Sequence, residues 1–107
     1  MAMTDASIST SSNAIPRPDI ITSEFISLVK KAGVREAFLF GSFSRGEELP
    51  GSDIDVLVRF GHDFRLVEQL DLMVKLSRLT GRQVDLITDV DPIFEPYILP
   101  TLVPIPL

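Results

Sequence analysis

The chain of 107 residues contains no cysteine. This absence excludes disulfide bonds, thiolate metal sites and a cysteine nucleophile, and it is consistent with a reducing compartment. No apolar run approaches the roughly 20 residues that a membrane-spanning helix needs. The N-terminus also lacks the basic start and apolar stretch of a signal peptide. We therefore expect a cytoplasmic protein.

Basic residues are scarce: 10 Lys and Arg stand against 15 Asp and Glu, which gives a net charge of −5. Non-specific binding to a nucleic-acid backbone needs clustered Lys and Arg, so we expect no direct nucleic-acid binding. A basic protein partner or a metal-bound nucleotide suits this charge better. The length limits the chain to one small domain, without room for a second substrate-binding domain.

Residues 1–18 are rich in Ser, Thr, Asn and Pro without a helix or strand period, which predicts a disordered N-terminal tail before a domain at 19–107. A helix is expected at 19–32, capped by Asp19 and ended by Gly33. Its apolar stripe consists of Ile21, Phe25, Leu28, Val29 and Ala32.

Strands are expected at 36–40, 53–60 and 83–88, with a helix at 64–79 between the last two. We expect this helix to bury Leu66, Leu70, Met73 and Leu76, with Val67 and Val74 beside them. A helical turn near 94–99 and a short edge strand near 102–105 follow in the proline-rich end. The fold class is α+β (mixed α/β): a small mixed sheet with helices packed on one face.

The strand at 53–60 alternates, so Ile54, Val56, Val58 and Phe60 face the helices while Asp53 and Asp55 face away. The two carboxylates are about 7 Å apart at Cα, from a rise of roughly 3.3 Å per residue. They can reach one Mg²⁺ or two neighbouring ions. Asp85, on the next strand, is the best candidate for a third ligand.

The turn Gly41-Ser42 directly follows the strand at 36–40. Glycine lets the backbone approach phosphate oxygens, the Ser42 hydroxyl and nearby N–H groups can donate to them, and Arg45 can grip a phosphate. Phe43 is the aromatic residue best placed to approach a base. Each feature alone is most often without a functional role, since an isolated Asp-x-Asp is most often solvated surface and a Gly-Ser turn is usually only a turn. Their order and spacing together favour a nucleotide site.

The segment Gly41-Ser42-Phe43-Ser44-Arg45-Gly46, followed after five residues by Ser52-Asp53-Ile54-Asp55, resembles the signature of the nucleotidyltransferase superfamily with the DNA polymerase beta-like fold. More narrowly, it resembles the minimal nucleotidyltransferase (MNT) proteins, and residues 82–86 resemble their third-acid strand. The similarity covers about residues 19–105. The resemblance implies that Gly41, Ser42 and Arg45 contact the triphosphate and that Asp53, Asp55 and Asp85 bind Mg²⁺. Asp85 would also help to activate the acceptor hydroxyl.

Minimal proteins of this family, the MntA-type antitoxins, are often partners of a HEPN-domain ribonuclease toxin. The resemblance thus implies a protein adenylyltransferase (EC 2.7.7) that moves AMP from ATP to a tyrosine hydroxyl of a HEPN toxin. A chain too short for a further helical domain is expected to take its acceptor from another molecule.

Two alternatives stay open at this point. The chain could neutralise a toxin by sequestration alone, as a binding module without catalysis. It could also be a flavodoxin-like or Rossmann domain that uses 41–46 as a phosphate loop. The sequence disfavours the flavodoxin-like or Rossmann alternative, because the phosphate loop of such a domain opens directly into a helix. Here the loop leads through Pro50-Gly51 into the acidic strand.

Overall fold

The computed structural model describes residues 14–107, so most of the expected tail, residues 1–13, lies outside the described residues. Along the chain the elements are α2 (Ser23–Lys31), β1 (Val34–Phe40), α3 (Ser42–Arg45), β2 (Ile54–Phe60), α4 (Leu66–Thr80), β3 (Val84–Ile87), α5 (Glu95–Ile98), the 3₁₀ turn η1 (Leu99–Thr101) and β4 (Val103–Ile105). Within the described part of the chain, no helix is long and apolar enough to cross a membrane.

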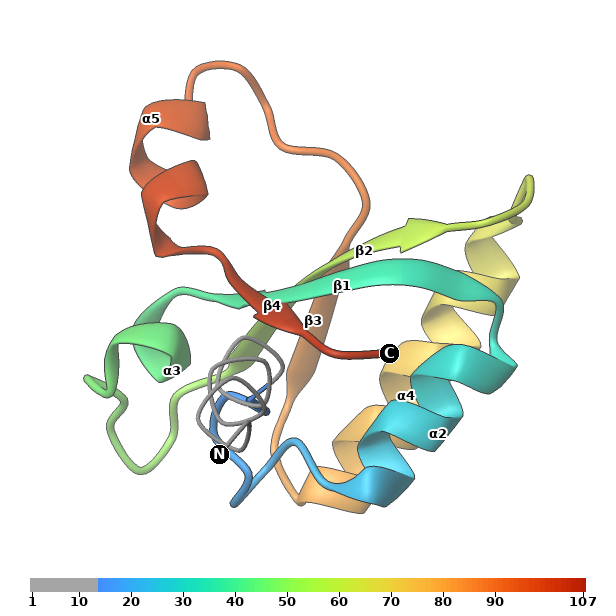
Figure 1. Ribbon diagram of the computed structural model, residues 1–107, viewed down its shortest axis with the longest axis horizontal. Coiled ribbons are helices and arrows are strands. Elements are labelled where there is room, and N and C mark those ends of the chain that lie inside the picture. Colours follow the sequence, from blue (N-terminus) through green and yellow to red (C-terminus); the bar gives the residue numbers. More distant parts are fainter. Residues whose placement is uncertain (1–13) are drawn as a thin grey trace, which may run out of the picture.

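The strands form one mixed sheet in the order β3-β2-β1-β4. β1 pairs antiparallel with both β2 and β4, whereas β2 and β3 are parallel. Helices α2 and α4 lie together against one face of this sheet, and α5 stands on the other side (Figure 1). This arrangement confirms the predicted fold class and the predicted edge strand, in which Pro104 lies opposite Phe38.

The hydrophobic core lies between the sheet and helices α2 and α4. Alternate residues of β2, Ile54, Val56 and Val58, are fully buried, as the period of two predicts for a strand with one covered face. From α2, Phe25 and Val29 are equally buried. The predicted stripe of the first helix and the predicted inward face of β2 are therefore confirmed.

The first helix begins later than predicted, and its cap is different. The N-cap is Thr22, whose Oγ1 accepts a hydrogen bond of 3.2 Å from the backbone N–H of Phe25. Asp19 is not the cap, because its carboxylate is instead hydrogen-bonded to the guanidinium of Arg17. A threonine at this position satisfies one of the N–H groups that the first helical turn leaves free.

A β-bulge lies at the start of β1, between Val34 and Glu36. The bulge adds one residue to β1, which lets Val34 and Ala37 both point into the core although they are three residues apart. The pairing then continues regularly to the end of the strand, where Phe40 faces Asp55.

The predicted inner face of α4 is wrong in part. The helix buries Leu72 and Leu76, whereas Leu66 is 66% and Leu70 45% exposed; Val67 and Val74 are exposed as well. Apolar residues form two stripes on opposite sides of α4, and periodicity alone cannot tell which stripe meets the sheet. The predicted end of the helix is confirmed, since Gly81 adopts the left-handed conformation at the C-cap.

Candidate active site

The two central aspartates are brought together by the parallel pairing of β2 and β3. Asp55 is the second residue of β2 and Asp85 the second residue of β3, and the two are direct register partners. Register partners on adjacent strands project to the same side of a sheet. Both therefore lie on the face opposite α2 and α4, and Asp53 comes just before β2 begins.

The electrostatics of Asp55 show that these carboxylates influence one another. Burial raises the pKa of Asp55 above its ordinary value, and the negative charges of Asp85 and then Asp53 raise it further. All three effects disfavour the ionised carboxylate. The site thus concentrates negative charge that a bound cation would neutralise.

Gly41 makes room for the Asp55 carboxylate. It has φ 74° and ψ −153°, a combination that is essentially restricted to glycine. A β-carbon added at Gly41 would lie 2.6 Å from Oδ2 of Asp55. The carbonyl of Gly41 accepts bonds from the hydroxyl and the N–H of Ser44, at 2.8 and 3.1 Å, which hold the turn in place.

The carboxylates of the site fit a magnesium ion whose remaining ligands come from phosphate oxygens of the substrate and from water. Across residues 14–107, no three His, Cys, Asp or Glu side chains lie close enough to hold a metal ion by themselves. Mg²⁺ usually binds one or two carboxylates together with substrate phosphates and water, so it does not require such a cage. Oxygen donors whose burial and mutual repulsion raise the pKa of Asp55 suit this ion.

The other residues of the motif are distributed along α3 and the loop after it. Ser42 is the first residue of α3, next to Gly41. Arg45 is the last, and its guanidinium is paired with Glu47 at 2.6 Å and about half exposed. Ser42 therefore directly follows the glycine that lies against Asp55, whereas the Arg45 side chain is held by Glu47.

Phe43 does not approach a base, contrary to the expectation from the sequence. It is 1% exposed and belongs to the hydrophobic core. The guanidinium groups of Arg17 and Arg82 each lie about 5 Å from its ring centroid, at 5.1 and 5.0 Å. Because α3 places Phe43 inward, the ring anchors the Gly-Ser turn to the core rather than contacting a ligand.

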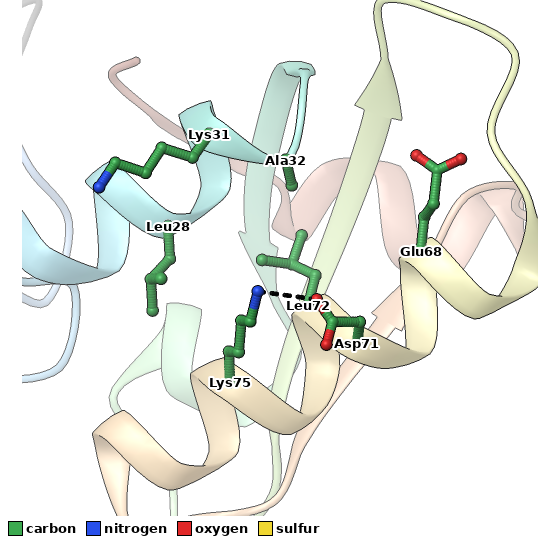
Figure 2. Close-up of a pocket in the computed structure, with 7 residues that line it drawn as sticks. All are labelled: Leu28, Lys31, Ala32, Glu68, Asp71, Leu72 and Lys75. Atoms are coloured by element: carbon green, nitrogen blue, oxygen red, sulfur yellow. Dashed lines mark ion pairs between the residues drawn. The ribbon is translucent and has the colours of Figure 1, made fainter.

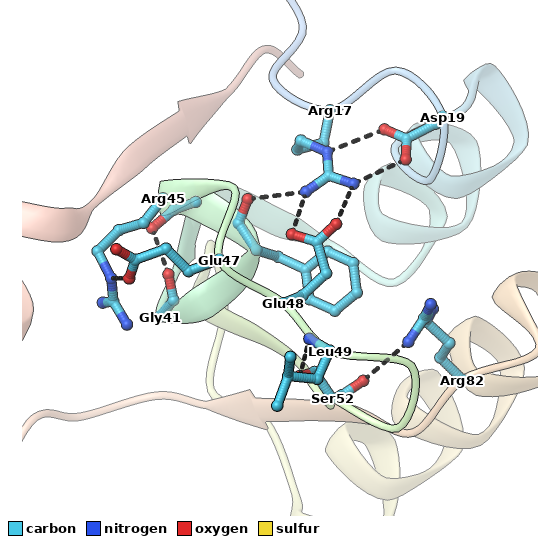
Figure 3. Close-up of polar contacts among 11 residues, drawn as sticks. Arg17, Asp19, Gly41, Arg45, Glu47, Glu48, Leu49, Ser52 and Arg82 are labelled. Carbon is cyan, nitrogen blue, oxygen red and sulfur yellow. Dashed lines mark hydrogen bonds and ion pairs between the residues drawn. The ribbon is translucent and has the colours of Figure 1, made fainter.

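Arg17, which falls within the predicted tail, fastens the loop that leads into the aspartates. Its guanidinium binds both carboxylate oxygens of Glu48, at 2.7 and 2.8 Å, and donates to the carbonyl of Phe43 at 3.2 Å (Figure 3). It also binds Asp19 through two bonds. The Arg17 guanidinium lowers the pKa values of Glu48 and Asp19.

A second fixed point of this loop is Arg82, which donates to the carbonyl of Ser52 at 3.3 Å, one residue before Asp53 (Figure 3). Glu48 lies 31 residues from Arg17, and Ser52 lies 30 residues from Arg82, so no local pattern could have indicated these two contacts.

A hollow of about 270 Å³ between α2 and α4 contains none of the motif residues. It is lined by Leu28 and Leu72 and by the stems of charged side chains, and Lys75 is paired with Asp71 at 2.8 Å (Figure 2). It lies on the helical side of the sheet, away from the face that carries Asp55.

Comparisons with known proteins agree with this fold. The model of the nucleotidyltransferase domain family matches residues 20–103. The chain is 40% identical over 68 residues to the protein adenylyltransferase MntA of Thermococcus cleftensis. The aligned region covers 64% of this chain and 69% of that protein.

Among solved structures, one described as a minimal nucleotidyltransferase shares 30% identity at a TM-score of 0.68, covering 77% of this chain and 86% of the other. A crystal structure of a toxin–antitoxin with AMP-PNP shares 25% identity at a TM-score of 0.59, covering 66% of this chain and 60% of the other. The family match and the shared fold define an enzyme that transfers nucleotidyl groups. The chain belongs to the nucleotidyltransferase domain family.

Proposed function

We propose that the chain is a Mg²⁺-dependent protein adenylyltransferase that moves AMP from ATP to a tyrosine hydroxyl of a partner HEPN-type toxin and so acts as its antitoxin. The observation that carries the proposal is the pairing of Asp55 with Asp85 on one sheet face, beside a glycine that leaves space for the Asp55 carboxylate. The resemblance to the MNT proteins, the similarity to a protein adenylyltransferase and the fold shared with a toxin–antitoxin structure support it.

In this proposal Asp53, Asp55 and Asp85 hold the metal, while Gly41, Ser42 and Arg45 contact the triphosphate. The first N–H groups of a helix have no intrahelical acceptor, so the turn into α3 offers donors to phosphate oxygens. When bound, Mg²⁺ would neutralise phosphate charge and favour ionisation of the hydroxyl. Arg45 would exchange its partner Glu47 for a phosphate oxygen.

The reaction forms a bond between the acceptor oxygen and the α-phosphorus of ATP. The bond from that phosphorus to the oxygen bridging to the β-phosphate breaks, and pyrophosphate leaves. The hydroxyl proton passes to a carboxylate, for which Asp85 is the candidate, and from there to water. The product is a phosphodiester between the acceptor side chain and AMP.

The test uses ATP labelled at either the α- or the γ-phosphate, with a co-purified HEPN partner as acceptor. We expect label on the partner from α-labelled ATP only, because γ-label leaves with pyrophosphate. Asp53→Ala and Asp55→Ala should abolish transfer, whereas Asp63→Ala, an exposed aspartate outside the site, should not. Undiminished transfer by both site variants would refute the catalytic assignment. Equal protection of cells by the inactive variants would show that binding alone neutralises the toxin.

A further inference from the structure

A groove lies on the sheet face that carries the aspartates, between the sheet and the segment 88–102 that contains α5. We call it the sheet-face groove and define it by six of its lining residues: Glu36, Phe38, Leu57, Asp89, Glu95 and Leu99. Its volume is about 450 Å³, within the range of sites that accept a small ligand or a few side chains. None of these residues belongs to the nucleotide or metal site described above.

The groove is continuous with the reacting centre. Its floor is the pair Phe38 and Leu57, which are register partners, and the next pair on the same face is Phe40 and Asp55. Leu57 follows Asp55 by two residues of one strand, which is about 7 Å at roughly 3.3 Å per residue. A chain segment lying in the groove would therefore end next to the carboxylates.

The groove combines an apolar floor with an acidic rim. Its charged residues are Glu36, Asp89 and Glu95 against a single base, Arg59, so three negative charges face one positive charge. This balance disfavours an anionic triphosphate. It equally disfavours a second copy of this chain, whose net charge is −5. A cationic and partly apolar occupant fits both features.

The wall of the groove also offers apolar contact area beyond the groove itself. Within segment 88–102, Ile93 is 72%, Phe94 55% and Tyr97 76% exposed. Such large apolar side chains gathered on one short segment are typical of a protein contact surface. The same segment contains Asp89, Asp91 and Glu95 and no Lys or Arg, so its charge repeats that of the rim.

We infer that the sheet-face groove is the docking site for the acceptor protein, and that it selects a segment of that protein which is apolar and basic and carries the reacting hydroxyl. This inference rests on the proposed function for the identity of the acceptor. Phe38 and the exposed apolar side chains of segment 88–102 supply contact area, since Leu57 itself is buried. The acidic rim supplies charge complementarity, and the position beside Asp55 delivers the hydroxyl to the α-phosphorus.

The test uses two fluorescein-labelled peptides of 15 residues with the same leucines and one tyrosine, one bearing lysines and the other glutamates in their place. By fluorescence anisotropy with the full chain, we expect the lysine peptide to bind at least tenfold more tightly. In ¹H–¹⁵N NMR spectra its shifts should concentrate on the groove residues, such as Phe38, Leu57 and Leu99. Equal affinities, no binding of either peptide, or shifts confined to other surfaces would overturn the inference.

Charge reversal supplies the second arm of the test. The double variant Glu36→Lys, Glu95→Lys should remove or invert the preference between the peptides. Glu24→Lys, Asp63→Lys, a matched double variant at exposed positions away from the groove, should keep it. Equal effects of the two double variants would assign the preference to net charge rather than to the groove and would count against it.

Label transfer separates this inference from the proposed function. If the wild-type chain binds the lysine peptide in the groove but transfers no AMP to any acceptor, the proposed function fails while the docking site stands. If transfer to the HEPN partner proceeds and the groove variant keeps an unchanged KM for that partner, the docking site fails while the proposed function stands. The expected result is a raised KM with an unchanged kcat.

Discussion

Gly41→Ala should impair both the stability and the chemistry of the protein, by amounts that the structure allows us to work out. Gly41 has φ 74° and ψ −153°, a backbone region that costs a residue other than glycine of order 1–3 kcal/mol. This cost arises from the backbone alone and would be present whatever surrounded the new methyl group.

The second effect acts on Asp55. The new β-carbon would lie 2.6 Å from its Oδ2 and 3.5 Å from its Cγ, so the carboxylate must rotate away. Forcing a side chain about 30° off its rotamer costs about 0.5–1.5 kcal/mol, which brings the expected loss of unfolding free energy to about 1.5–4.5 kcal/mol. A catalytic group misplaced by about 1 Å can reduce the rate about 100-fold, so we expect transfer to fall by at least that factor.

Gly46→Ala is the matched control. Gly46 also has a positive φ, 69°, but no atom lies within 4 Å of a β-carbon built there. Its left-handed conformation costs about 1–2 kcal/mol in a residue with a β-carbon, so this variant should be destabilised yet transfer AMP at nearly the wild-type rate. Urea unfolding and initial rates of α-label transfer measure the two effects. Equal rates for the two variants would refute the argument that Gly41 exists to admit Asp55.

Two further variants test the electrostatics of the site and the support of its loop. The pKa of Asp55 is raised in the folded state, so ionisation of this carboxyl lowers the stability of the fold as the pH rises above the ordinary pKa of 3.8. Without divalent cations, Asp55→Asn should therefore have a higher melting temperature than wild type at pH 7. The difference in melting temperature should disappear below pH 3.8. A constant gap from pH 3 to 7 would contradict this. Arg17→Ala should lower the melting temperature and the transfer rate more than Arg78→Ala, an exposed arginine on α4, and equal losses would argue against the loop-fastening role.

The parts of the site that the sequence predicts are those that depend on the period of a strand. Alternation in residues 53–60 placed Asp55 on the face away from the core, and the structure confirms this together with its pairing to Asp85. The predicted boundary is wrong by one residue, because β2 begins at Ile54 and Asp53 lies just outside it. A local pattern specifies which face a strand residue occupies only because one face is buried.

What the sequence could not predict depends on contacts between distant segments. Arg17 looks like part of a polar tail until the fold brings Glu48 to it, 31 residues along the chain. The burial of Phe43 follows from the direction in which a four-residue helix presents its side chains, which no periodicity reveals in so short an element. For α4, two apolar stripes fit the helical period equally well, and only the position of the sheet decides that Leu72 rather than Leu70 is buried.

The position of the β-bulge explains how so short a sheet holds its carboxylates accurately. A bulge changes the local twist and pairing, and in this sheet it lies opposite Phe60 and Arg59, at the far end of β2 from Asp55. From Ala37 to Phe40 the pairing is regular, so the end of β1 that leads into Gly41 meets Asp55 without irregularity. Functional groups on regular strands are held more precisely than those on loops. The same strand can therefore fill the core with one set of alternate residues and present its chemistry with the other.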